Sequence, residues 1–299
     1  MIDLTQFLKN DILYSKLTEN VIEIRCENSQ NDNKPTIPSL SNIEKFKIIF
    51  DFYGNPYLPW NAYIKYKRNY YYNYRIFKDK KLADNFYKFY MEKINPKKNW
   101  DILDFGCGEG RIIGLLNQLG FKNIIGQDIY FFKKWEYYNA NFVITPIKCN
   151  KFYPYKDNVF DVVFSIQVRM YLNDSQLEEH IFNISRILKR NGYFIFEDRN
   201  EFMINPKHYL ANRYCPYIHK RERILNLLAQ NNFEIIEEKT FGIDTKYFPR
   251  FFGWLRSFLT PKCEFDNFYF YEKSWLDKVL KRYIPKGKEP LHLLIGKKK

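Results

Sequence analysis

The chain is 299 residues long, which is enough to bury one large α/β core with extensions, or a core plus a small second unit. Its formal net charge of +14 is compatible with a polyanionic partner, although basic faces are also ordinary solvated surface. The cysteines argue against a zinc site and a disulfide framework, because they are odd in number and lack C-x-x-C spacing: Cys26, Cys107, Cys149, Cys215 and Cys263. We therefore expect no metal.

Apolar runs in the chain are shorter than the roughly 18 to 20 residues that span a bilayer. The first residues, Met1 to Thr5, lack the basic stretch followed by an apolar one that starts a secretory signal. We expect a cytoplasmic protein without a transmembrane segment, and the sequence leaves its oligomeric state open.

Residues 1–80 are expected to form an N-terminal extension or cap. They include a polar stretch from Glu27 to Lys34 and prolines at 35, 38, 56 and 59, and they show little sustained periodicity. Apolar side chains then recur on one side of a predicted helix over 81–94, at Leu82, Phe86, Phe89 and Tyr90.

Segment 65–98 is strongly basic, with eleven lysines and arginines against three acids, and tyrosines are interleaved with the cations. Such a segment could hold the phosphates of RNA while its tyrosines stack on bases. The alternative is compositional, because Lys, Asn, Ile, Tyr and Phe are raised along the whole chain. RNA is therefore an alternative partner.

The run from Asp101 to Arg111 is the most informative stretch. An apolar segment ends at Asp104 and breaks into glycines at 106, 108 and 110, which allow a sharp turn and close approach of a ligand to the backbone. The apolar face of a helix follows over 112–119, and Gly120 stands where a left-handed C-terminal cap belongs. This pattern predicts a strand, a ligand-binding loop and a helix.

The loop does not fit a dinucleotide. That fingerprint needs G-x-G-x-x-G, and Arg111 occupies the place of the third glycine. Asp104, two residues before Gly106, would repel a pyrophosphate and favour an ammonium group. A ligand with an ammonium near the strand end and a ribose beyond it suits the loop better, and S-adenosylmethionine is such a ligand.

A second acid follows at the end of a predicted short strand, Asn123 to Ile129. Asp128 comes about 20 residues after the glycine loop, where nucleotide-binding βαβ units place a carboxylate on the ribose hydroxyls. The alternative is a solvated aspartate at a strand end. With the glycine loop upstream, the ribose role is favoured.

The rest of the chain continues the alternation of strands and helices. A turn at Asp157-Asn158 precedes an apolar strand over 160–164. Asn173 or Asp174 can cap a helix that carries Leu177, Ile181, Ile184 and Leu188 and closes at Lys189 to Gly192. Further elements are expected as a strand over 193–198, a helix over 220–231, a strand over 233–241 and a closing strand over 291–297.

With this loop, the acid at 128 and the segment from Pro154 to Ser165, the chain resembles the class I S-adenosylmethionine-dependent methyltransferases. The resemblance is to the group that acts on small molecules, lipids and sugars, with a type 11-like domain. It covers about residues 82–242 and resumes at 291–297. It implies a Rossmann-like, seven-stranded, mostly parallel sheet with helices on both faces. The implied methyltransferase domain is 81–299.

The resemblance also implies where S-adenosylmethionine binds. Asp104 would orient its amino acid end, and Asp128 would hold the ribose with Ile129 beside it. Cys149 stands where many relatives carry an acid, so Asn150 would contact adenine. The expected cofactor contacts are Asp104, Gly106, Gly108, Gly110, Asp128, Ile129, Asn150, Ser165 and Gln167.

An aromatic insert over 243–290 precedes the closing strand. A segment of this length is usually functional or carries its own structure. It could wall an acceptor pocket, rest in a membrane interface through residues 251–259, or pack on the core. The sequence leaves these interpretations open.

The chemistry follows from the cofactor more than from a catalytic side chain, because positioning a nucleophile against an electrophilic methyl can suffice. A hydroxyl acceptor benefits from a base, for which His208 and His219 are weak candidates. We expect methyl transfer to oxygen, with nitrogen second, on a small molecule, lipid or saccharide. The alternatives are an RNA methyltransferase that uses 65–98 and a non-catalytic binding protein.

Overall fold

The computed structural model of the chain describes residues 2–25, 80–146, 152–200, 217, 219–241, 289 and 291–299. Four features expected from the sequence lie outside these residues. They are the aromatic insert at 243–290, the part of the basic segment before residue 80, Asn150 and His208.

The described residues form one nine-stranded sheet with the order β1-β2-β5-β4-β3-β6-β7-β9-β8. Neighbours from β2 to β7 in this order run parallel, whereas β9 is antiparallel to both β7 and β8. The strands are β1 (Tyr14–Lys16), β2 (Val21–Ile24), β3 (Ile102–Phe105), β4 (Ile124–Asp128), β5 (Asn141–Ile144), β6 (Phe160–Ile166), β7 (Leu188–Arg199), β8 (Phe233–Phe241) and β9 (Leu291–Lys298).

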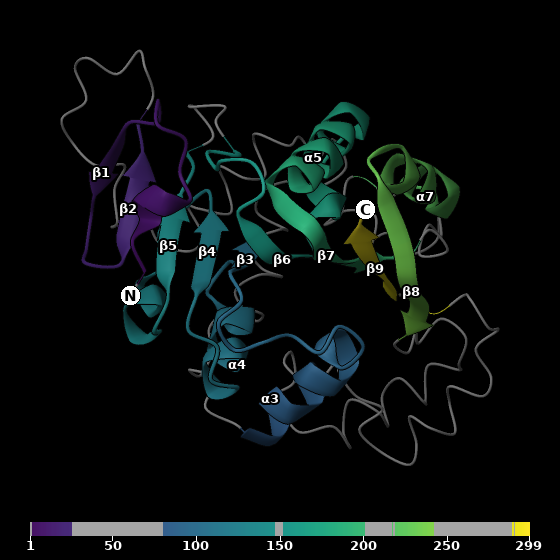
Figure 1. Ribbon diagram of the computed structural model, residues 1–299, viewed down its shortest axis with the longest axis horizontal. Helices are drawn as coiled ribbons and strands as arrows, with labels where there is room; N and C mark the ends of the chain where they lie inside the picture. Colours follow the sequence, from purple (N-terminus) through teal and green to yellow (C-terminus); the bar gives the residue numbers. More distant parts are fainter. Residues whose placement is uncertain are drawn as a thin grey trace, which may run out of the picture.

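Helices cover both faces of this sheet, with α3 and α4 on one side and α5 and α7 on the other (Figure 1). The mostly parallel α/β fold expected from the sequence is confirmed. The α-helices are α3 (Lys80–Phe86), α4 (Arg111–Gln118), α5 (Asp174–Ile187) and α7 (Arg221–Gln230); the shorter helical segments are η1 (Leu4–Gln6), η2 (Tyr87–Met91, a π-helix), η3 (Lys133–Tyr137) and η5 (Arg169–Tyr171).

Side chains alternate between the two faces along each strand, as strand geometry requires. Ile102 of β3 and Phe164 of β6 pack in a core cluster with residues of α3 and α4, and we call this side the α4 face. Leu103 and Val163, one residue along, pack with residues of α5 and α7, and we call that side the α5 face. The glycine-loop helix therefore shares its face with every second residue of these strands.

The expected strand count of seven is corrected to nine by the N-terminal segment. Residues 14–24, read from the sequence as part of an irregular extension, form β1 and β2 at the edge of the sheet. Strand β2 is buried throughout and pairs in parallel with β5, from Val21 opposite Phe142. Two strands of three and four residues are too short for a period to stand out in the sequence.

Helix α5 begins as expected and ends one residue early. Asn173 caps it in a capping box, in which the Asn173 side chain accepts from the Gln176 N–H and the Gln176 side chain accepts from the Asn173 N–H. Strand β7 starts directly at Leu188, which was expected in the helix. Residues 189–192 form an irregularity in the pairing with β6, where Asn191 takes a φ of 64°.

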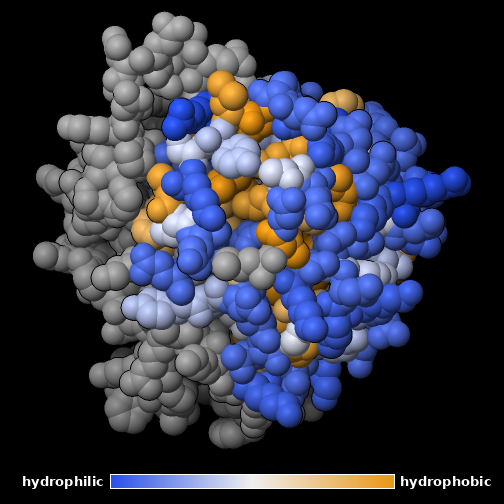
Figure 2. Space-filling model, turned by 60° about the vertical axis from the view of Figure 1, so that its left-hand side comes forward, coloured by the Kyte–Doolittle hydropathy of each residue, from blue (hydrophilic) through white to orange (hydrophobic). Residues whose placement is uncertain are grey.

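The surface that Figure 2 shows is largely hydrophilic, with hydrophobic residues gathered near the middle of the view. Among the described residues, the large hydrophobic side chains that are exposed are Leu13, Tyr14, Tyr137 and Phe182. No helix in the described part of the chain has the length and apolar character needed to cross a membrane.

Replacing the cap of α5 should destabilise the fold measurably. Asn173→Ala leaves the Gln176 N–H without its side-chain acceptor, so we expect a loss of about 1 kcal/mol in the free energy of unfolding. Urea denaturation followed by circular dichroism measures it. The matched control is Glu179→Ala, an exposed change in the same helix that should stay within about 0.5 kcal/mol. Equal stability of the two variants would contradict the capping role.

Candidate functional site

The candidate site lies at the carboxyl ends of the parallel strands, where the chain changes direction across the sheet. From β3 the chain builds β4 and β5 on one side, and it then returns to place β6 and β7 on the other. Ligands of open α/β sheets bind in the crevice at such a switch point. The loop after β3 and the ends of β4 and β6 therefore border the candidate site.

Three glycines shape the loop between β3 and α4, and all three have left-handed φ angles: 73° at Gly106, 52° at Gly108 and 85° at Gly110. A Cβ on Gly106 would lie 2.5 Å from Val168 Cγ2, and one on Gly110 would lie 2.7 Å from Tyr138 Cε2. A Cβ on Gly108 would meet nothing within 4 Å. Gly106 and Gly110 are thus needed by the packing of the protein, while Gly108 borders open space that a ligand can approach.

The loop is anchored to β4 by hydrogen bonds. The backbone N–H groups of Gly106 and Cys107 both donate to the carbonyl of Gln127, at 2.8 and 2.9 Å. The Gly108 carbonyl accepts from Trp135 Nε1 at 2.8 Å. Trp135 is fully buried and stacks on Phe142, with ring centroids 4.5 Å apart. These contacts hold the loop in one conformation before any ligand arrives.

Asp128 is the last residue of β4, and its carboxylate also holds the glycine loop. Its Oδ2 accepts from the Gly108 N–H and its Oδ1 from the Ile129 N–H, each at 2.7 Å. Each carboxylate oxygen can accept more than one hydrogen bond. The position of Asp128 is therefore compatible with a pair of ribose hydroxyls.

Asp104 lies near the carboxyl end of β3 and is 1% exposed. It pairs in register with Phe164, which places its side chain on the α4 face. Its Oδ2 has no hydrogen-bond partner among the described residues. Burial raises the pKa of Asp104 to about 8; the positive charge of Arg111 opposes this shift and the negative charge of Asp128 adds to it.

An unpartnered buried carboxylate oxygen is costly unless a ligand satisfies it. A cationic group that reaches Asp104 past Gly108 would do so, whereas an anionic one would add to the cost. The ammonium of S-adenosylmethionine fits this donor set, and a pyrophosphate does not.

Ser165 does not lie where the resemblance implied. It is fully buried on the α5 face, and its Oγ is 3.0 Å from His180 Nε2. Burial lowers the pKa of His180 to about 3, so the imidazole is neutral and structural. The alternation of β6 turns Ser165 away from Asp104, and we leave it out of the proposed cofactor contacts.

Gln167 follows β6 at the site edge. It has a φ of 60°, which is unusual for a residue with a side chain, and its backbone N–H donates to the Glu197 carbonyl at 2.8 Å. Its Nε2 is buried without a partner among the described residues. A strained backbone and an unpaired amide together are typical of a ligand contact.

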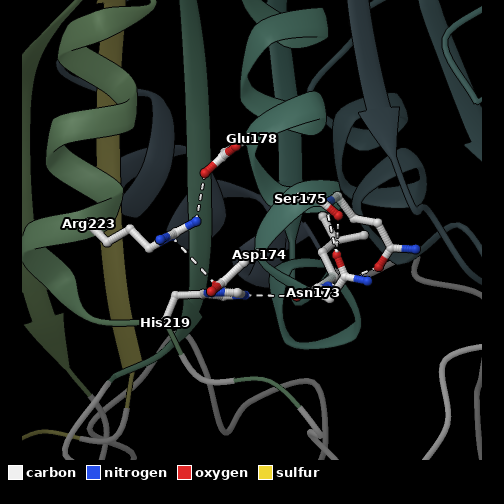
Figure 3. Close-up of polar contacts among 8 residues, drawn as sticks. Asn173, Asp174, Ser175, Glu178, His219 and Arg223 are labelled. Atoms are coloured by element: carbon white, nitrogen blue, oxygen red, sulfur yellow. Dashed lines mark hydrogen bonds and ion pairs between the residues drawn. The ribbon is translucent and has the colours of Figure 1, made fainter.

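His219 is engaged within the protein and does not suit the role of a base. Its Nε2 lies 2.8 Å from the Leu172 carbonyl, and its Nδ1 lies 3.1 Å from Asp174 Oδ1. Figure 3 shows the ring beside Asp174, with Arg223 reaching from α7 toward Asp174 and Glu178 of α5. Burial lowers its pKa. We therefore assign His219 to the joint between α5 and α7, which corrects the expectation of a catalytic base.

Glu197 is an acidic residue that the sequence predicted only as part of a strand and not as a member of the site. Its side chain is fully buried near the end of β7, and its Oε2 accepts a hydrogen bond from the Tyr90 hydroxyl. Its Oε1 has no partner among the described residues. The signal was present in the sequence as two acids, Glu197 and Asp198, directly after the apolar run Tyr193 to Phe196.

No cluster of three or more potential metal ligands occurs in the described part of the chain.

Comparison with known proteins finds a family model that matches part of the chain. Residues 103–196, from β3 into β7, match a family model described as a methyltransferase domain. None of the curated proteins searched matches the chain.

Several solved structures are similar to it. They include geranyl diphosphate C-methyltransferase from Streptomyces coelicolor A3(2), with 16% identity over 73% of this chain and 80% of that one and a TM-score of 0.48. A TehB-like SAM-dependent methyltransferase from Corynebacterium glutamicum has 17% identity over 80% and 97%, with a TM-score of 0.43. The 1,6-didemethyltoxoflavin-N1-methyltransferase of Burkholderia thailandensis has 12% identity over 89% and 94%, with a TM-score of 0.46.

Similarity at this level says nothing about the acceptor of this chain. The family match agrees with the resemblance drawn from the glycine loop and its acids. Residues 103–196 therefore belong to a methyltransferase domain.

Proposed function

We propose that this enzyme transfers a methyl group to an oxygen of a small molecule, lipid or saccharide, with nitrogen as the second choice of acceptor atom. The observation that carries the cofactor part is the buried Asp104 oxygen that has no hydrogen-bond partner among the described residues. The acceptor part rests on the acidic groups of the site.

The bound cofactor would supply an electrophilic methyl group on a positively charged sulfur. Asp104 would hold the ammonium, and the loop of Gly106, Gly108 and Gly110 would line the ligand. Asp128 would bind the ribose, with Ile129 beside it. Gln167 would face the methionine portion, and Asn150, outside the described residues, stays a prediction for adenine.

The charges of the site support an acceptor that is not a polyanion. Asp104, Asp128 and Glu197 lie toward the carboxyl ends of β3, β4 and β7, and Arg111 is the cation that acts electrostatically on both Asp104 and Glu197. When ionised, these carboxylates would repel a phosphate-rich chain. We therefore favour a small or weakly charged acceptor over RNA.

The proposed domain division keeps 81–299 as the methyltransferase domain and 1–80 as an N-terminal extension. Strands β1 and β2 show that part of this extension belongs to the same sheet. The extension is thus built onto the catalytic unit.

Loss of the Asp128 carboxylate should weaken cofactor binding. We expect Asp128→Ala to cost about 1 to 3 kcal/mol in the affinity for S-adenosylhomocysteine, because charge-assisted hydrogen bonds to the ribose and to the Gly108 N–H disappear. Isothermal titration calorimetry measures this. Glu136→Ala, an exposed acid in the segment after β4, is the control and should bind normally. Unchanged affinity of Asp128→Ala would refute the ribose role.

Cofactor affinity should depend on pH through Asp104. Its carboxyl, with a pKa of about 8, is mostly protonated at neutral pH in the cofactor-free protein, and an ammonium binds only the ionised form. The affinity for S-adenosylhomocysteine should therefore rise about tenfold per unit between pH 6 and pH 7.5. Calorimetry across this range measures the slope.

Two variants separate Asp104 from the other buried acid. Asp104→Asn should bind weakly, with no slope over the same range. Glu197→Gln removes a carboxyl whose pKa burial raises to about 7, and it should keep the slope. A slope that persists in Asp104→Asn would assign the titration to another group.

The acceptor class can be tested with methyl-labelled S-adenosylmethionine and fractionated cell extract. We expect the label in the small-molecule, lipid or glycan fraction, because the carboxylates of the site disfavour a polyanion. Label recovered in RNA would overturn the acceptor class, and RNA binding that falls steeply with salt would support that outcome. Tight cofactor binding with no labelled product from any fraction would favour a binding protein without turnover.

A further inference from the structure

Glu197 is a fully buried carboxylic acid that the contacts described so far do not explain. It lies in β7 on the α4 face, between Ile166 of β6 and Leu293 of β9, which are its partners in register. Both neighbours are apolar and buried. An acid in such surroundings is retained only where hydrogen bonds or a ligand compensate its burial.

Only one of its two oxygens is satisfied among the described residues. Oε2 accepts from the hydroxyl of Tyr90, which is itself 1% exposed, and Oε1 has no partner. Tyr90 is located in the π-helix that follows α3, a deformation that occurs frequently at functional sites. The pair therefore presents one anchored and one open oxygen.

Glu197 lies on the same face of the sheet as Asp104. Asp104 is in register with Phe164, and Glu197 is in register with Ile166, two residues further along β6. With strands about 4.8 Å apart and about 3.3 Å per residue, the two Cα atoms are roughly 12 Å apart on one face. That separation leaves room for the amino acid end of the cofactor, the methyl group and an acceptor atom between the two carboxyls.

Resting on the function proposed above, we propose that Glu197 is the general base of the reaction and takes the proton of an acceptor hydroxyl, with Tyr90 as its positioning residue. The acceptor O–H bond breaks and its proton moves to Glu197 Oε1. The oxygen's electron pair forms the new C–O bond as the methyl–sulfur bond breaks and its electron pair stays on sulfur. The proton later leaves Glu197 to water.

The electrostatics of the site suit this role. Burial raises the pKa of Glu197 to about 7, while the Tyr90 hydrogen bond, Arg111 of α4 and Lys239 of β8 lower it and Asp198 raises it. A base with a pKa near the working pH combines a large ionised fraction with a strong pull on the proton. Lys239 Nζ donates to the Phe89 carbonyl and lies 3.3 Å from Glu237 Oε1. Lys239 therefore forms its ion pair with Glu237 and not with Glu197.

The surroundings also indicate the acceptor. Tyr90, Ile166 and Leu293 pack beside Glu197 in the core, and Phe89 makes edge contacts with Tyr90 and Phe241. An apolar or aromatic compound that carries a hydroxyl group matches these surroundings. We therefore assign the acceptor to hydroxyl-bearing, largely apolar small molecules.

Phenols of graded acidity test the base. At pH 8 and saturating S-adenosylmethionine, Glu197→Gln should methylate unsubstituted phenol about 10²- to 10⁴-fold more slowly than the unchanged enzyme. For 4-nitrophenol, which is largely ionised at this pH, the two enzymes should agree within about threefold, because no proton remains to be removed. Glu234→Gln, an exposed acid on β8, is the matched control and should behave as the unchanged enzyme with both phenols.

Tyr90→Phe tests the positioning role through the pH profile. The unchanged enzyme should lose kcat with phenol as the pH falls through about 7, because Glu197 becomes protonated. Without the Tyr90 hydrogen bond the pKa of Glu197 rises. The pH at which kcat falls should therefore move up by about one unit at most. Infrared difference spectra of the cofactor-free protein should show a carboxyl titrating near pH 7 that is missing in Glu197→Gln.

Binding of S-adenosylhomocysteine separates the possible failures. If Glu197→Gln binds it normally and loses equal activity with both phenols, Glu197 is structural and the inference is wrong. If the unchanged enzyme binds it but methylates no phenol, the assigned acceptor class is wrong while the cofactor assignment stands. If the unchanged enzyme does not bind it, the proposed function itself fails.

Discussion

The hydrogen bonds that join the glycine loop to the end of β4 are the constraint on which the site depends. Two loop N–H groups share the Gln127 carbonyl, and the Gly108 N–H is held by Asp128. These hydrogen bonds hold a backbone of left-handed residues against the Asp128 carboxylate. Because the loop is already formed, little binding energy is needed to order it when the cofactor arrives.

Two carboxyls buried near the carboxyl ends of the strands lower the stability of the fold when they are ionised. Asp104 and Glu197 both have raised pKa values because burial disfavours their ionised forms. Their folded-state pKa values exceed the ordinary values of 3.8 and 4.5, so the cofactor-free protein loses stability as the pH rises above about 4, and the loss is complete above about 8. A cationic ligand at Asp104 offsets this cost, which couples folding stability to occupancy of the site.

Strong local patterns in the sequence predicted the fold and part of the site. The glycine spacing, the acids at 104 and 128 and the apolar strands placed β3, α4 and β4 close to their observed limits, and the strand over 233–241 is confirmed without change. Such signals survive in a single sequence because left-handed backbone, turn chemistry and side-chain alternation depend on nearby residues. The closing of α5 was off by one residue, since helix and strand meet there without a loop.

Which side chains meet across the sheet was decided by the tertiary structure. The sequence predicted cofactor contacts for both Ser165 and Asp104. The alternation of side chains along β6 instead places Ser165 beside His180, on the opposite face of the sheet. Tyr90 and Glu197 are 107 residues apart, and only the packing of the π-helix on β7 joins them. Residues 14–24 join the sheet because β2 pairs with the edge of β5. The sequence by itself determined the class of ligand and the order of the elements. Long-range pairing, which no local pattern encodes, determined on which face of the sheet each polar group lies, which partner it contacts and which protonation state it takes.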